Sequence, residues 1–203
     1  MNLTAKERER FDFAVIANWI PKGERVLDLG CGDGRLLRYL RETKGVVGYG
    51  VEIDHERVLG CIRNDVDVIQ IDIERGLSGF EDHSFDHVII SQALQAMHAT
   101  ERILGEMLRV ADEAVVSFPN FAYQTNRQAI ASGHMPVSED LPYEWYDTPN
   151  VRFFTIADFE ELCDKLGIEV RERLAFDDAG QPVADDPNLN GSLAFYRLGR
   201  KPA

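Results

Sequence analysis

Residues 26–34 read Val-Leu-Asp-Leu-Gly-Cys-Gly-Asp-Gly, and this stretch decides the fold. Residues 26–29 predict a buried strand, and glycines then occupy alternate positions at Gly30, Gly32 and Gly34, just before an apolar helical stripe. Because glycine has no Cβ, such a turn can adopt unusual backbone angles and let a ligand lie against bare main chain. The amides at the start of the helix can also attract a carboxylate. A strand, a glycine turn and a helix in this order predict a cradle for a cofactor.

The spacing of the glycines indicates which kind of cofactor fits. Dinucleotide-binding folds favour Gly-x-Gly-x-x-Gly, in which the third glycine lies where the helix crosses the strand. Here that position is Arg35. The pattern from Asp28 to Gly34 is instead Asp-x-Gly-x-Gly-x-Gly, and it resembles motif I of the class I S-adenosylmethionine (SAM)-dependent methyltransferases. A glycine turn without a ligand is the alternative, but the predicted strand before it and helix after it favour a cradle.

Length, charge and cysteine content narrow the class of protein. The chain has 203 residues, which predicts a single domain, and its net charge of −13 disfavours a nucleic-acid partner. A local basic patch would still be compatible with that charge. No apolar run is long enough to span a membrane, and the charged N-terminus has no secretory apolar core. Cys31, Cys61 and Cys163 are too widely spaced for a disulfide framework or a zinc site, so we expect a cytoplasmic protein without a metal.

Strands and helices are predicted to alternate along the chain. Thr4 and Glu7 match a capping box for a first helix that ends before Pro21, and Thr155 with Asp158 predicts the start of a later helix. Alternation of this kind predicts an α/β fold with a parallel sheet and helices on both faces. The predicted strands are residues 26–29, 46–53, 68–71, 85–91, 114–118, 168–176 and 193–198.

Two connections stand apart from this alternation within the single domain 1–203. Residues 119–150 contain four prolines, several aromatic residues and several carboxylates, and a connection this long inside a compact domain is usually functional or disordered. Its aromatic content argues against simple disorder, so we expect a lid over a small acceptor substrate or a surface that docks a partner. Residues 177–190 are polar and proline-bearing, and we expect them to form a flexible hairpin loop.

A SAM pocket needs main-chain polar groups for the amino-acid end, an acidic acceptor for the ribose and an apolar slot for the adenine. Glu52 lies at the end of the second strand, twenty residues after Gly32, where the acidic residue of the methyltransferase family binds the ribose. Asp54 competes with it, but we expect Asp54 to cap the next helix. The positions after strands three and four could instead hold a turn residue and a plain strand end. The candidate cofactor-binding residues are Asp28, Gly30, Cys31, Gly32, Gly34, Glu52, Ile53, Asp72, Ile73, Ser91 and Gln92.

No catalytic residue is assigned. His98 lies near the expected substrate side and could act as a general base, but a surface or helix-capping histidine is more common. After the fourth strand there is no Asn/Asp-Pro-Pro-aromatic motif of the kind that amino-methylating enzymes use. Methyl transfer to an acceptor that is already nucleophilic can proceed by proximity and alignment alone. The sequence therefore supports a bound cofactor better than it supports a particular reaction.

Two further stretches give the chain a narrower resemblance. They are Gln92-Ala93-Leu94-Gln95 and Leu141-Pro142-Tyr143-Glu144-Trp145-Tyr146-Asp147-Thr148-Pro149-Asn150. Together with residues 25–34, they resemble the MetW family of methionine-biosynthesis proteins. The resemblance implies a Rossmann-like class I methyltransferase fold, whose seven-stranded, mostly parallel sheet has an antiparallel final strand. It also implies bound SAM or S-adenosylhomocysteine, and a homoserine O-acyltransferase partner of the MetX type that this protein supports. An active methyltransferase for a small-molecule acceptor is the alternative.

Overall fold

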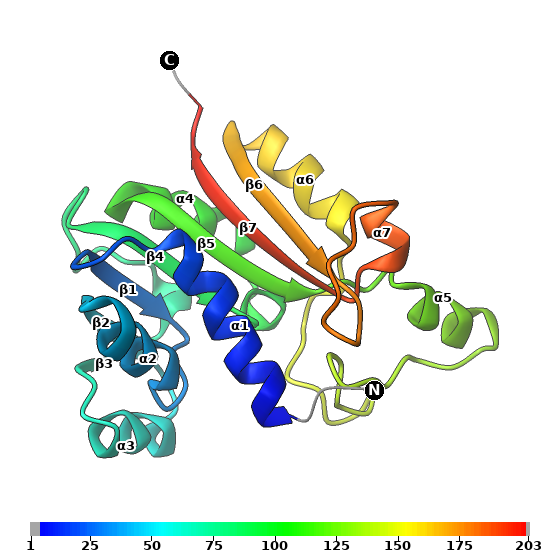
Figure 1. The fold of residues 1–203 in the computed structure, drawn as a ribbon, viewed down its shortest axis with the longest axis horizontal. Coiled ribbons are helices and arrows are strands. Elements are labelled where there is room, and N and C mark those ends of the chain that lie inside the picture. The colour runs from blue at the N-terminus through cyan, green and yellow to red at the C-terminus, as the bar shows by residue number, and fades with distance from the viewer. Residues whose placement is uncertain (1–4, 202–203) are drawn as a thin grey trace.

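Seven strands form one mixed sheet in the order β3-β2-β1-β4-β5-β7-β6 in a computed structural model that describes residues 5–201 (Figure 1). Strands β1 to β5 pair in parallel, whereas β7 runs antiparallel to both β5 and β6. The predicted parallel sheet with an antiparallel final strand is therefore confirmed. The strands are β1 (Arg25–Leu29), β2 (Val47–Glu52), β3 (Val68–Gln70), β4 (Phe85–Ser91), β5 (Ala111–Pro119), β6 (Ile168–Phe176) and β7 (Leu193–Arg200).

Helices cover both faces of the sheet (Figure 1). The first face packs against α1 and α2, with Cys61 of α3 in the same cluster, and the second face packs against α4 and α6. The helices are α1 (Ala5–Trp19), α2 (Arg35–Lys44), α3 (His55–Arg63), α4 (Thr100–Val110), α5 (Gln124–Ala131), α6 (Ile156–Lys165) and α7 (Pro187–Asn190), with 3₁₀ turns η1 (Ile73–Arg75) and η2 (Leu94–Ala96).

The central strands are apolar on both faces because both faces are covered. Along β4, the fully buried side chains of Val88 and Ile90 belong to the core beneath α4 and α6, while Ile89 belongs to the core beneath α1 and α2. The same alternation recurs at Val115 in β5 and Phe195 in β7, whose side chains both belong to the core beneath α1 and α2. Side chains that point alternately to opposite faces thus tie the two helical layers to one sheet.

The two irregular connections contain helices that the sequence patterns did not predict. Residues 119–150 include α5, and residues 177–190 join antiparallel β6 and β7 but include α7. Helix α5 has few buried residues, so it lacks the apolar stripe that would reveal it, and α7 is a single turn that begins at Pro187. Thr4 of the predicted capping box lies outside the described residues. Within residues 5–201, no helix has both the length and the apolar content to cross a bilayer.

Candidate cofactor site

The glycine turn joins β1 to α2 at the carboxyl edge of the parallel strands, where ligands bind in open α/β folds. Gly30, Gly32 and Gly34 all have left-handed φ angles, of 72°, 59° and 79°. A Cβ placed on Gly32 would have no atom within 4 Å, whereas one placed on Gly34 would lie 3.0 Å from the Cβ of Val66. The face of the turn at Gly32 is therefore open, and the face at Gly34 is packed against the protein.

Most amides of the turn are already used within the protein. The amides of Gly30 and Cys31 donate to the carbonyl oxygen of Val51 at 2.8 and 3.1 Å, and that of Gly34 donates to the carbonyl of Cys31 at 3.0 Å. The amide of Gly32 donates to Oε2 of Glu52 at 3.0 Å. The amides of these three glycines are thus not free for a ligand, so the turn offers a ligand mainly its open shape at Gly32. The first turn of α2 has no side-chain cap, so its amides remain.

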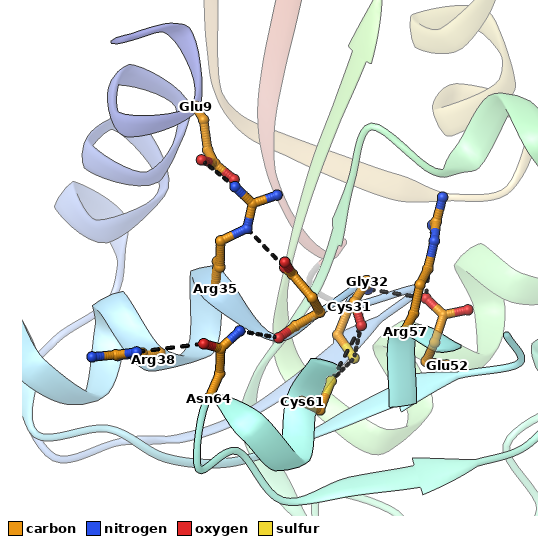
Figure 2. A network of polar contacts seen from close by, with 10 residues as sticks. Glu9, Cys31, Gly32, Arg35, Arg38, Glu52, Arg57, Cys61 and Asn64 are labelled. Carbon is orange, nitrogen blue, oxygen red and sulfur yellow. Dashed lines mark hydrogen bonds and ion pairs between the residues drawn. The ribbon is translucent and has the colours of Figure 1, made fainter. Parts of the chain in front are cut away.

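Neighbouring helices hold the turn in place (Figure 2). From α3, the Cys61 thiol donates to the carbonyl of Gly32 at 3.2 Å, and Asn64 at the end of that helix donates to the carbonyl of Asp33 at 2.8 Å. Arg35 pairs with Asp33 at 2.8 Å and with Glu9 of α1 at 2.7 Å. The cradle is therefore fixed by contacts from α3 and from α1 that join residues distant in sequence.

Glu52 lies at the end of β2, where the sequence predicts the ribose acceptor, but in this structure it also shapes the cradle. Its side chain is buried, and Oε1 accepts the amides of Ile53 and Asp54 at 2.8 and 3.0 Å while Oε2 accepts the amide of Gly32. Oε2 accepts a single hydrogen bond and has the Arg57 guanidinium 3.9 Å away as an ion-pair partner, so it can take one more donor. Asp54 caps α3 as predicted, because its Oδ1 accepts the amide of Arg57 at 2.9 Å.

Asp28 is a buried carboxyl group behind the turn. It is 2% exposed and has no hydrogen-bond donor among residues 5–201. Burial and the nearby charge of Glu52 raise the pKa of Asp28 from 3.8 to about 7. A buried carboxyl without a donor is costly in its ionised form and would gain from a cation placed beside it.

The residues after β2 and β3 form the adjacent part of the edge. Ile53 presents an apolar side chain that is 60% exposed, which suits a flat ring stacked on it. Asp72 caps η1, its Oδ1 accepting the amide of Glu74 at 2.9 Å, and Ile73 packs partly against the core. Asp72 therefore also acts as a turn residue, which was the alternative prediction for this position. Its Oδ2 lies 3.6 Å from Nε of Arg75.

The end of β4 supplies Ser91 and Gln92. The hydroxyl of Ser91 contacts that of Ser117 at 3.1 Å, and the amide of Gln92 donates to the carbonyl of Ser117 at 2.9 Å. Gln92 has a left-handed φ of 50°, an uncommon conformation for a residue other than glycine and one found more often at functional sites. Its side-chain amide donates to Asp12 of α1. This contact spans 80 residues, and no sequence pattern pointed to Asp12.

Among the described residues at this edge, no side chain has the surroundings of a catalytic base, nucleophile or metal ligand. The side chain of His98 is exposed, and its main-chain amide donates to Glu74. The thiols of Cys31 and Cys61 lie 3.7 Å apart, and burial raises the pKa of each, which keeps both protonated and weakly nucleophilic. Within the described part of the chain, no three His, Cys, Asp or Glu residues cluster as metal ligands.

Comparison with solved structures shows the class of fold. A SAM-dependent methyltransferase from Thermotoga maritima is similar with a TM-score of 0.69 and 19% identity, over 96% of this chain and 90% of that chain. The [4+2]-cyclase SpnF is similar with a TM-score of 0.71 and 18% identity, over 98% of this chain and 83% of that chain. The chain thus has the class I SAM-dependent methyltransferase fold, a fold that is also found in a protein named for a different reaction.

Sequence comparison shows the family. Residues 10–198 match the family model of the methionine biosynthesis protein MetW, and the chain belongs to this family. It is 40% identical over 205 residues to the bifunctional methionine biosynthesis protein MetXA/MetW of Rhodopirellula baltica, covering 93% of this chain. The match covers 33% of that relative, so the chain corresponds to about a third of its length.

Proposed function

We propose that this protein is a SAM-binding accessory subunit of a homoserine O-acyltransferase of the MetX type in methionine synthesis. The observation that carries the proposal is the relative from Rhodopirellula baltica, whose name joins MetXA and MetW in one chain. Two functions that occur in a single chain in one organism are good candidates for physical association in another. The acyltransferase would perform the chemistry, and this chain would support it.

The shape and the polar groups of the cradle support SAM or S-adenosylhomocysteine as its ligand. The open face at Gly32 admits a ligand against the main chain, and Asp28 is a buried carboxyl group that a cationic ligand would favour in its ionised form. Exposed Ile53 and the free capacity of Oε2 in Glu52 suit an adenosine. The residues proposed to hold the cofactor are Asp28, Gly30, Cys31, Gly32, Gly34, Glu52, Ile53, Asp72, Ile73, Ser91 and Gln92.

A SAM-dependent effect on the acyltransferase would report the supply of methionine, because SAM is made from it. Such sensing requires the cofactor to bind differently to the free and the complexed protein. A short series of contacts supports this idea. The side-chain amide of Gln95 donates to the carbonyl of Gln92 at 2.8 Å, and the Gln95 carbonyl accepts the amides of Val151 and Arg152, both at 3.0 Å. The segment that begins at residue 141 is thereby attached to the edge of the proposed pocket.

The test is an acyl-transfer assay with the purified homoserine O-acyltransferase of the same organism. Its rate of acyl transfer to homoserine is measured with and without this protein, at several SAM concentrations. Higher acyltransferase activity in the presence of the protein is expected. Unchanged activity at every ratio of the two proteins would remove the accessory role, whereas activation that ignores SAM would remove the sensing part alone. Acceptor-dependent release of S-adenosylhomocysteine from a metabolite extract would instead favour the alternative, an active methyltransferase.

A further inference from the structure

Residues 143–153 carry a cluster of exposed apolar side chains, here called the aromatic surface. It consists of Tyr143, Trp145, Tyr146, Val151 and Phe153, of which Tyr143, Trp145 and Phe153 line one small depression. Trp145 and Tyr146 are each 70% exposed, which is unusual for side chains this large. Single exposed apolar residues are common, but a contiguous apolar patch marks a site of interaction, and Tyr and Trp are the residues that most often anchor interfaces.

Contacts along the segment keep the aromatic surface in place. Arg152 donates to the carbonyl of His98 at 3.1 Å, and Phe153 packs on Phe121 with ring centroids 4.9 Å apart. The rings of Trp145 and Tyr146 meet edge to face at 5.6 Å. A surface that is ordered before binding loses less conformational entropy when a partner arrives.

A hollow of about 580 Å³ adjoins the aromatic surface at Phe153. It lies between the N-terminal ends of α4 and α6, and its apolar lining includes Phe154, Phe159 and Leu162. Two arginines, Arg102 and Arg152, and two carboxylates, Glu101 and Asp158, also line it. An apolar hollow beside exposed aromatic rings can receive an anchoring side chain from a partner, which is the usual arrangement at the energetic centre of an interface.

The charges next to the aromatic surface indicate the chemistry of its partner. Glu144 and Asp147 are exposed and adjoin the aromatic residues in sequence, and neither carboxylate pairs with a cation among the described residues. In a chain with a net charge of −13, a second copy docked on this surface would bring like charges together. The surface therefore suits a different protein, one that presents apolar side chains surrounded by Lys or Arg.

We propose that the aromatic surface is the docking site for the homoserine O-acyltransferase, an inference that rests on the proposed function above. The relative that unites the MetXA and MetW names in one chain selects this partner. The surface of the acyltransferase that docks here carries an apolar anchor for the hollow and basic residues opposite Glu144 and Asp147.

The test measures the dissociation constant between the full-length protein and the acyltransferase encoded in the same genome. The double substitution Trp145→Ala/Tyr146→Ala is expected to raise it at least about 30-fold, as for the loss of interface hot spots. A matched control, Val47→Ala/Ile62→Ala, removes apolar side chains that are 65% and 63% exposed elsewhere and should change it less than about threefold. Charge reversal by Glu144→Lys/Asp147→Lys should weaken binding most at low salt.

Each outcome separates this inference from the proposed function. If the wild-type protein does not bind the acyltransferase at all, the proposed function fails and the docking site fails with it. If the wild type binds and the Trp145→Ala/Tyr146→Ala variant binds equally well, only the docking site is wrong. Loss of SAM affinity in that variant, with docking retained, would identify a lid instead. Sedimentation that shows a wild-type homodimer abolished by the variant would identify a self-association surface.

A second measurement on the wild-type protein does not depend on any variant folding. Amide hydrogen exchange of residues 143–153 should slow at least about tenfold when the acyltransferase is added, because docking excludes water from the segment. Exchange at residues 143–153 that stays unchanged in a saturated complex would overturn the assignment.

Discussion

Replacing Asp28 with asparagine should remove a loss of stability that the wild-type protein undergoes as the pH rises from 5 to 8. Burial and the charge of Glu52 raise the pKa of the Asp28 carboxyl from 3.8 to about 7, and unfolding returns the group to water. Between about pH 4 and 7 the folded protein therefore holds a proton that the unfolded chain has released. Stability contributed by this group is complete below the unfolded pKa and is lost as the pH rises to the folded pKa.

The size of the effect follows from that pKa difference. Between pH 5 and pH 8 the relevant interval is about 2 pH units, from 5 to 7, and each unit is worth about 1.36 kcal/mol, so the wild type loses roughly 3 kcal/mol. The Asp28→Asn variant has no proton to lose. Its amide lacks a partner at this site and costs about 1–3 kcal/mol, but that cost is the same at every pH. The free energy of unfolding of the variant minus that of the wild type should therefore rise by roughly 3 kcal/mol across this range.

Urea denaturation at pH 5, 6, 7 and 8 measures this difference directly, with the free energy extrapolated to water for each protein. The control is Asp65→Asn, because the Asp65 side chain is 96% exposed and its substitution should leave the difference flat with pH. A difference for Asp28→Asn that varies by less than about 0.5 kcal/mol from pH 5 to 8 would refute the reasoning, since it would mean that the carboxyl ionises as freely in the fold as in water.

Three further predictions concern the same site and one helix cap. If a cationic cofactor binds the ionised form of Asp28, the affinity for SAM should increase up to about tenfold from pH 6 to 7.5, and Asp28→Asn should abolish this dependence in calorimetric titrations. Gly32→Ala should cost only about 1–2 kcal/mol of stability, from its φ of 59°, but reduce SAM affinity more than about tenfold; Gly34→Ala should destabilise more, because its Cβ meets Val66. Thr155→Ala should remove the capping box of α6 and lower the free energy of unfolding by about 1 kcal/mol, and an unchanged urea midpoint would contradict this.

Much of the architecture could be predicted from local patterns. The strand, glycine turn and helix around residues 26–34 are encoded by neighbours in sequence, and the predicted β4 and β6 have the observed ends. Apolar runs that fill both faces of a strand distinguish buried parallel strands from amphipathic ones. Helices α5 and α7 were not predicted because neither has a long apolar stripe.

The candidate site was predictable as a set of positions but not as a set of contacts. The residues that follow parallel strands must meet at one edge of the sheet, so Glu52, Asp72 and Ser91 could be grouped from their order alone. The sequence could not reveal that the Glu52 carboxylate accepts hydrogen bonds from the amides of Gly32, Ile53 and Asp54.

The sequence by itself determined the class of fold and the family, because glycine spacing, strand periodicity and the stretch from residue 141 to 150 are local features. Only the tertiary structure decided the chemical state of the site. Asp28 has a pKa of about 7 because packing removes water from it and places Glu52 nearby, and Gln92 reaches Asp12 across 80 residues of chain. Burial and long-range contacts depend on how the layers assemble, so they set the electrostatics of the cradle and the exposure of Trp145 and Tyr146, which no local pattern encodes.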